Sequence, residues 1–143
     1  MKINYHQAKE LGLTDLWPSQ LDSVVPVVVP CQPKCNKWHQ EFFGLLKSGP
    51  FQDIESESVK LRLAGKTWYT PDFVATRLPD RTLWAFEVKG FMRDDAAVKV
   101  KVAASQYPWV VWVLATRSRS GAWLCRFVTP DSGIQRKVWT PSW

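Results

Sequence analysis

The chain has 143 residues, of which 45% are hydrophobic, so we expect a single domain over 1–143 with a buried core and an N-terminal extension of about 1–35. A polar start, the lack of a long apolar run and an odd number of cysteines (three) argue against a secretory signal, a membrane span and a disulfide framework, so we expect a cytoplasmic protein. The formal net charge of +6 favours a polyanionic partner such as nucleic acid.

The clearest helix signal lies at residues 36–48. Asn36 is a suitable N-cap, and apolar side chains follow at helical spacing, namely Trp38, Phe42, Leu45 and Leu46. Glu41 lies beside Phe42 on the flank of this apolar stripe, from which it can reach the edge of a sheet.

The other elements are predicted from periodicity, β-branched content and turn residues. In chain order they are a short helix over 5–11, an edge strand or extended arm over 24–29, strands within 51–63, over 67–76 and over 83–88, a helix from Asp94 or Asp95 to about Gln106, strands over 109–116 and 122–129, and an extended tail after Pro130. With these helices and strands we expect an α/β fold. Trp84 and Trp109 are expected in its core.

The loop between the strands over 67–76 and 83–88 fixes their register. It contains Leu78-Pro79-Asp80-Arg81. Proline suits the second position of a type I turn but not a two-residue type I′ loop. A four-residue loop around this turn pairs Arg77 with Thr82.

This register places two carboxylates opposite each other. Counting outward from the Arg77–Thr82 pair, Asp72 faces Glu87, with Cβ atoms roughly 5 Å apart on one face of the hairpin. Lys89 is two residues beyond Glu87 and shares that face. The hairpin is thus predicted to have one charged face and one apolar face, the latter carrying Phe73, Ala75, Trp84, Phe86 and Val88.

Opposed carboxylates destabilise a strand pair unless a cation lies between them. Mg²⁺ prefers carboxylate ligands while keeping waters and taking phosphate oxygens, and Lys89 is then placed to orient or deprotonate an attacking water. The simpler interpretation is that Asp72 and Glu87 are solvated charges and Lys89 is their ion-pair partner, which is usual for an arbitrary hairpin. The shared face and Gly90 at the end of the strand favour the metal site.

The residues that carry this chemistry resemble a known motif. Pro71-Asp72, a spacer and Glu87-Val88-Lys89 resemble the PD-(D/E)XK nuclease motif. The wider context, with YTPDF at 69–73, EVKG at 87–90 and Asp94-Asp95 opening a basic helix, is similar to the junction-resolving endonuclease I family of phages. The stretch 37–74 also resembles small phage nucleases, and the whole resemblance covers residues 37–116.

The resemblance implies a restriction-endonuclease-like core with a mixed central sheet flanked by helices. It implies a fourth acid on the first core helix, which would be Glu41, and a Mg²⁺ site formed by Asp72, Glu87, Glu41 and the Val88 carbonyl, in which Mn²⁺ is expected to substitute. The implied activity is that of an endodeoxyribonuclease leaving 5′-phosphate and 3′-hydroxyl ends. Its substrate would be branched DNA such as a Holliday junction, cut by a homodimer in phage or mobile-element DNA processing, and hence in a bacterial host cytoplasm.

Basic residues near the motif are candidate DNA contacts. Arg93, Lys99 and Lys101 lie at the start of or within the helix after the motif, whose N-terminal amides favour phosphate. Lys99 and Lys101 project from different sides of this helix, so at least one of them is expected to be an ordinary solvated residue. Arg117 and Arg119 belong to a loop that we expect to be flexible; a solvated turn is an equal alternative there. Two further aromatic residues could stack on bases or pack at a dimer interface, namely Trp139 and Trp143.

Three other interpretations stay open. Cys31, Cys35, His39 and Cys125 could in principle bind zinc, although their spacing favours free thiols and a helix-face histidine. A catalytically silent DNA-binding or assembly module on the same fold would tolerate loss of the acids, yet Asp72, Glu87 and Lys89 are all present. A site-specific duplex nuclease of restriction or transposition type would be expected to carry a separate specificity domain, and no such domain is visible.

Overall fold

The structure is a computed structural model and describes residues 36–90 and 94–142. These residues belong to one compact unit, Cys31–Trp143. Several predictions concern residues outside the described ranges, namely the extension over 1–35 with its segments 5–11 and 24–29, Cys31, Cys35, Arg93 and Trp143.

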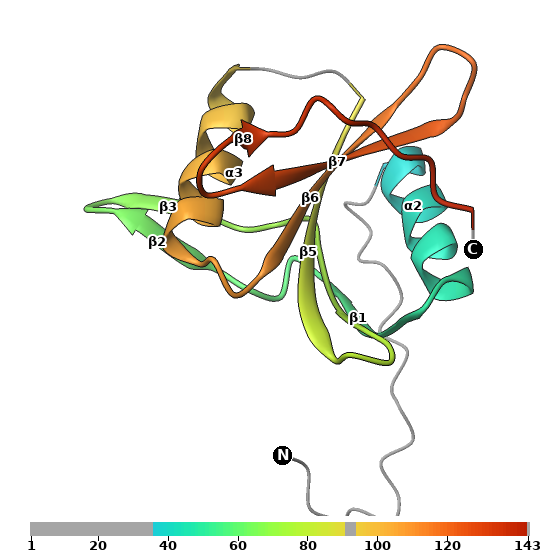
Figure 1. The fold of residues 1–143 in the computed structure, drawn as a ribbon, viewed down its shortest axis with the longest axis horizontal. Coiled ribbons are helices and arrows are strands. Elements are labelled where there is room, and N and C mark those ends of the chain that lie inside the picture. The colour runs from blue at the N-terminus through green and yellow to red at the C-terminus, as the bar shows by residue number, and fades with distance from the viewer. Residues whose placement is uncertain (1–35, 91–93, 143) are drawn as a thin grey trace, which may run out of the picture. The chain divides into compact units, whose positions relative to one another are not determined.

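The described elements combine helices and strands, as expected for an α/β fold: five strands follow α2, and three more follow α3 (Figure 1). They are α2 (Lys37–Ser48), β1 (Phe51–Ser56), β2 (Leu61–Ala64), β3 (Thr67–Tyr69), β4 (Phe73–Arg77), β5 (Thr82–Lys89), α3 (Asp94–Gln106), β6 (Val111–Arg117), β7 (Trp123–Thr129) and β8 (Gly133–Ile134). Six strands form a mixed sheet in the order β1-β4-β5-β6-β7-β8, and β2 and β3 form a separate hairpin. Only β5 and β6 pair in parallel within the sheet, and α3 is the crossover between them.

The two helices cover opposite faces of the sheet. Phe42 of α2 packs in one apolar cluster with Phe86 of β5, whereas Val100 of α3 packs in a second cluster with Ala85, the neighbour of Phe86. Successive strand residues point to opposite faces, so the clusters lie on the two sides of the sheet. Among the described helices, none combines the length and the apolar character that crossing a membrane requires.

The expectation of one charged face and one apolar face is therefore wrong. The face that carries Glu87 also carries Ala85 and Leu114, both nearly inaccessible to solvent. Helix α3 and the β2–β3 hairpin cover this face, because Val100 and Leu63 pack in the same cluster. Asp72, Glu87 and Lys89 lie at one end of a face whose central residues, such as Ala85 and Leu114, are apolar.

Helix α2 forms where predicted. The Asn36 side chain accepts a hydrogen bond from the His39 backbone N at 3.0 Å, which is an N-cap contact. Phe42 and Leu46 are fully buried, but Trp38 from the same apolar stripe is 42% exposed.

The register of the β4–β5 hairpin is also confirmed. Arg77 pairs with Thr82, and Phe73 pairs with Phe86, so the preceding residue, Asp72, lies opposite Glu87. The loop has the predicted four residues, but its Leu78–Pro79 peptide bond is cis, unlike the bonds of the expected type I turn.

The strand predicted over 67–76 is two strands. β3 pairs with β2, whereas β4 pairs with β1 and β5. Pro71 lies in the break and has no backbone N–H to donate to a ladder, so the chain leaves one sheet and enters the other there. The segment 51–63 divides in the same way between β1 and β2.

Trp84 is buried as predicted, but Trp109 is not. Trp109 is 69% exposed and lies in the turn before β6, where Pro108 precedes it. The buried tryptophan of this strand is Trp112, whose indole N donates to the Tyr107 carbonyl at 3.1 Å. A continuous apolar run identified the strand but not the residue at which burial begins.

Candidate active site

The structure brings Asp72, Glu87 and Lys89 together at the end of β5. The Lys89 Nζ lies 2.8 Å from Glu87 Oε1 and 3.9 Å from Asp72 Oδ2. One ammonium group thus contacts both opposed carboxylates. The three side chains predicted to share one face therefore lie in contact.

Asp72 is fixed by two further elements. Its Oδ2 accepts a hydrogen bond from the Val88 backbone N at 2.7 Å, and its Oδ1 lies 3.2 Å from the His39 Nε2 of α2. Gly90 allows this approach, because a Cβ at that position would overlap the ring of Trp38 in the first turn of α2. Strand β5 and helix α2 therefore hold Asp72 between them.

Glu87 is held from the other side. It is 5% exposed, and its Oε2 accepts a hydrogen bond from the Tyr69 hydroxyl at 2.7 Å. Burial and then the negative charge of Asp72 raise the pKa of Glu87 above its ordinary value, although Lys89 and Tyr69 oppose this. Burial, followed by the charge of Glu87, also raises the pKa of Tyr69, so its hydroxyl stays a donor.

The sequence patterns did not indicate that Tyr69 contacts Glu87 or that His39 contacts Asp72. Tyr69 stands three residues before Asp72 in the YTPDF stretch, but only the break at Pro71 shows that it belongs to a different hairpin from Asp72. His39 is the residue that the Asn36 cap bonds, so it lies in the first turn of α2, at the end of the helix nearest the motif. The Asn36 cap and Gly90, taken together, are the sequence signals that indicate His39 near Asp72.

Glu41, the predicted fourth acid, has a different partner. It forms an ion pair with the Arg117 guanidinium at the end of β6. That guanidinium also lies 5.4 Å over the ring of Trp123. Glu41 and Arg117 thus pair with each other, and both side chains are partly exposed.

The other candidate DNA contacts are spread over the surface. Lys99 and Lys101 are exposed on α3, and the stem of Lys101 lies against Gly133. Arg119 is exposed in a turn. This turn is closed by a hydrogen bond in which the Ser118 backbone N donates to the Ala122 carbonyl at 2.8 Å. The expected flexible loop is therefore a closed turn.

The described half of the zinc set does not form a cluster. Cys125 is fully buried in the α2-side core, and burial raises the pKa of its thiol to about 12. His39 is oriented towards Asp72 instead. Within residues 36–90 and 94–142, no group of three or more histidine, cysteine, aspartate or glutamate side chains is arranged to hold a metal ion.

The oxygen atoms of Asp72 and Glu87 are nevertheless of the kind that binds Mg²⁺, which needs only a few protein ligands. Asp72, directly before β4, and Glu87 in β5 supply hard oxygen donors, and Lys89 shows that a cation is accommodated beside both. Mg²⁺ is commonly held by one or two carboxylates, with water and substrate phosphate completing its coordination. Glu41 would join this set only after releasing Arg117.

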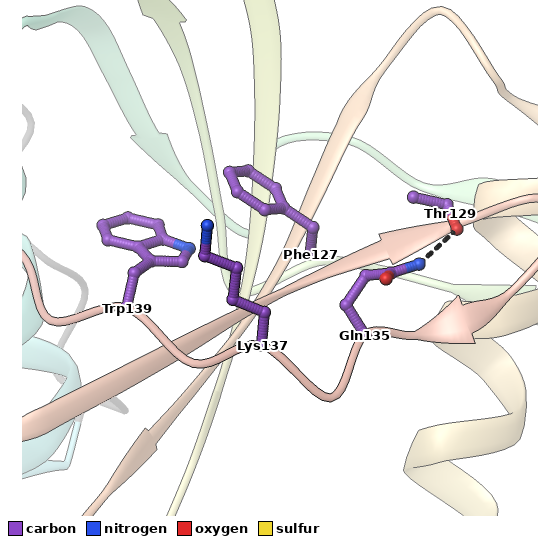
Figure 2. Close-up of a pocket in the computed structure, with 5 residues that line it drawn as sticks. All are labelled: Phe127, Thr129, Gln135, Lys137 and Trp139. Atoms are coloured by element: carbon purple, nitrogen blue, oxygen red, sulfur yellow. Dashed lines mark hydrogen bonds between the residues drawn. The ribbon is translucent and has the colours of Figure 1, made fainter.

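A concave region separate from Asp72, Glu87 and Lys89 lies beside β7 and the segment that follows β8 (Figure 2). It has a volume of about 590 Å³ and is lined by Phe127, Thr129, Gln135, Lys137 and Trp139. The rings of Phe127 and Trp139 stack 5.8 Å apart, and the Gln135 amide donates to Thr129 Oγ1 at 3.0 Å. Among the described residues, its lining has neither a carboxylate nor a thiol.

Comparison of the chain with protein-family models, with curated proteins and with solved structures gave no match.

Proposed function

We propose that the protein is a Mg²⁺-dependent endodeoxyribonuclease whose active site is Asp72, Glu87 and Lys89. The observation that carries this proposal is a pair of opposed carboxylates, Asp72 directly before β4 and Glu87 in β5, with one lysine within ion-pair distance of both. A buried carboxylate with a perturbed pKa beside a second carboxylate is typical of a functional site. A purely structural arrangement would avoid the repulsion between them.

The residues have distinct roles in this proposal. Asp72 and Glu87, with the Val88 carbonyl, would hold Mg²⁺, which supplies Lewis acidity towards a phosphoryl oxygen and lowers the pKa of a bound water. Lys89, as an ammonium, would orient the attacking water or offset charge on the phosphate; it could take the proton of that water only after losing one of its own. Tyr69 and His39 would fix the orientation of the two carboxylates.

The fold supports the same assignment. A mixed sheet with one helix against each face is the architecture that the resemblance to PD-(D/E)XK nucleases implies, and we propose that this sheet is a restriction-endonuclease-like core. We propose branched DNA as the substrate and a homodimer as the active form, on the same resemblance. The net charge of +6 suits such a partner.

The test is cleavage of a labelled four-way junction and a matched linear duplex in Mg²⁺ or in EDTA. Wild-type protein, Asp72→Asn and Lys89→Met are compared, with Asp131→Asn as the matched control, because Asp131 is an exposed acid outside the site. We expect Mg²⁺-dependent cuts near the branch point by the wild type and Asp131→Asn, and none by the two site variants.

Other outcomes lead to other functions. Equal cutting of junction and duplex would keep the nuclease and remove the junction specificity. Binding without cleavage by the wild type, in Mg²⁺ and in Mn²⁺, would favour the silent DNA-binding module. Cleavage that survives Asp72→Asn would refute the proposed site.

A further inference from the structure

The two faces of the β2–β3 hairpin differ in character. Leu63 and Tyr69 are buried against the body of the protein, where Tyr69 reaches Glu87. Arg62 pairs with Trp68 across the hairpin, and both side chains are exposed. Alternation along a strand therefore gives this hairpin an inner apolar face and an outer polar face.

The outer face is positively charged and carries no acid. Lys60 directly precedes β2, and its ammonium lies 5.3 Å over the ring of Trp68. Lys66 is exposed in the turn at the tip. The sequence from Ser58 to Thr70 contains no aspartate or glutamate. None of the carboxylates in the described ranges forms an ion pair with Lys60, Arg62 or Lys66.

The hairpin is held in place by the end of α3. The Gln106 side-chain amide donates to the Leu63 carbonyl at 2.7 Å, and the Tyr107 hydroxyl donates to the Arg62 carbonyl at 3.1 Å. Figure 1 shows the hairpin extending beyond α3 at the side of the molecule. The cations are thus presented on a fixed support, so little backbone entropy is lost when they bind a partner.

We propose that the outer face of the β2–β3 hairpin, formed by Lys60, Arg62, Lys66 and Trp68, binds the phosphate backbone of DNA. This inference rests on the proposed nuclease function, because it assigns the surface that holds the substrate of that site. Trp68 on the outer face and Tyr69, whose hydroxyl contacts Glu87, are adjacent residues of β3, so the proposed DNA surface and that contact belong to one strand.

Charge complementarity favours a polyanion, and DNA is the polyanion that the proposed active site requires. Duplex DNA carries one negative charge per about 1.7 Å of its axis, and cations that neutralise phosphates release condensed counterions. Arg62 keeps the outer nitrogens of its guanidinium for such contacts, because the hydrogen bond to the Gly65 carbonyl uses its Nε.

The test is DNA binding by fluorescence anisotropy in Ca²⁺ and in EDTA over a series of salt concentrations. The hairpin variant is Lys60→Gln/Arg62→Gln/Lys66→Gln, and the matched control is Lys47→Gln/Arg136→Gln/Lys137→Gln, all exposed cations on other elements. Each triple variant lowers the formal net charge by three, from +6 to +3. All six side chains are exposed, and equal thermal unfolding midpoints would verify that both variants fold.

We expect the hairpin variant to lose about tenfold or more in affinity at moderate salt, with a salt dependence shallower by about 2 to 3 in log–log slope, because each lost phosphate contact removes about 0.9. The control variant should stay close to the wild type. Equal losses in both variants, or no loss in the hairpin variant, would overturn the assignment of this surface.

The same experiment separates this inference from the proposed function. Wild type that cuts DNA while the hairpin variant binds like the wild type would refute the hairpin assignment alone. Wild type that binds through the hairpin but never cuts would refute the nuclease alone. Absence of any DNA binding by the wild type would overturn both.

Discussion

Glu87 is the one charged side chain that is buried among the described residues, and it lies opposite Asp72. Removing a carboxylate from water costs free energy unless it is paired and hydrogen-bonded. The Tyr69 hydroxyl and the Lys89 ammonium supply those partners, yet the pKa of Glu87 is still raised. Without a bound metal, ionised Glu87 therefore destabilises the folded protein.

This gives a prediction for Glu87→Gln. Since the folded-state pKa of Glu87 is above its ordinary value, its contribution favours folding while it is protonated and is lost as pH rises through that pKa. The amide cannot ionise, so in EDTA at pH 8 the variant should have a free energy of unfolding at least equal to that of the wild type, with the gap closing towards pH 5. Urea denaturation at several pH values measures this. A variant less stable than the wild type at every pH would contradict it.

Tyr69→Phe tests the positioning of Glu87. The change removes only the hydroxyl that bonds Glu87 Oε2, and loss of a partner of a metal ligand typically lowers metal affinity by about 10- to 100-fold. Titration calorimetry with Mn²⁺ measures the affinity without DNA. Ser48→Ala is the control and should bind Mn²⁺ like the wild type, because its hydroxyl bonds the Leu45 carbonyl at the end of α2 away from His39. Equal Mn²⁺ affinities in both variants would show that the Tyr69 hydroxyl does not position Glu87 for metal binding.

At the scale of elements, helix α2 and the β4–β5 hairpin could be predicted because their signals are local. The Asn36 cap and the spacing of Phe42 and Leu46 identify the helix, and the four-residue loop fixes the register of Asp72 against Glu87. The break at Pro71 was missed, because a run of β-branched and aromatic residues does not show which partner strand each half will find. The position of Tyr69 depends on that break.

Close packing of α2 on the end of β5 gives an element-scale prediction. Gly90→Ala should cost about 1–3 kcal/mol of unfolding free energy, because the added methyl overlaps the ring of Trp38 and moves the first turn of α2 away from Asp72. Gly44→Ala in α2 meets no neighbouring atom and should instead gain about 0.5–1 kcal/mol. Thermal and urea unfolding measure both changes. A Gly90→Ala protein as stable as the wild type would show that the two elements are not tightly packed.

At the scale of the whole molecule, the sheet is buried on both faces. The sequence predicts apolar strands, but it does not show that the β2–β3 hairpin and α3 cover the face of Glu87, since this depends on contacts between distant segments. The same limit explains Trp109, which is exposed although its strand is apolar. The charged groups of the site lie at the end of β5, at the margin of this core.

Substitutions of two aromatic residues test this core. Phe42→Ala should cost about 3–5 kcal/mol, because its side chain is fully buried and contacts the rings of Phe73, Phe86 and Trp123. Trp109→Ala should change stability by less than about 0.5 kcal/mol, because the ring is 69% exposed. Urea denaturation at neutral pH compares them. Similar losses in both variants would contradict the assignment of the core.

The most direct test of the central claim is calorimetric titration of Mn²⁺ into EDTA-treated protein without DNA. If Asp72 and Glu87 form a metal site, the wild type and Asp131→Asn will bind Mn²⁺ saturably at micromolar to millimolar concentrations, and Asp72→Asn will show no such binding. Competition by Mg²⁺ will shift the wild-type curve. Identical binding by wild type and Asp72→Asn, or no binding by the wild type, would contradict the claim that these opposed carboxylates are a metal centre.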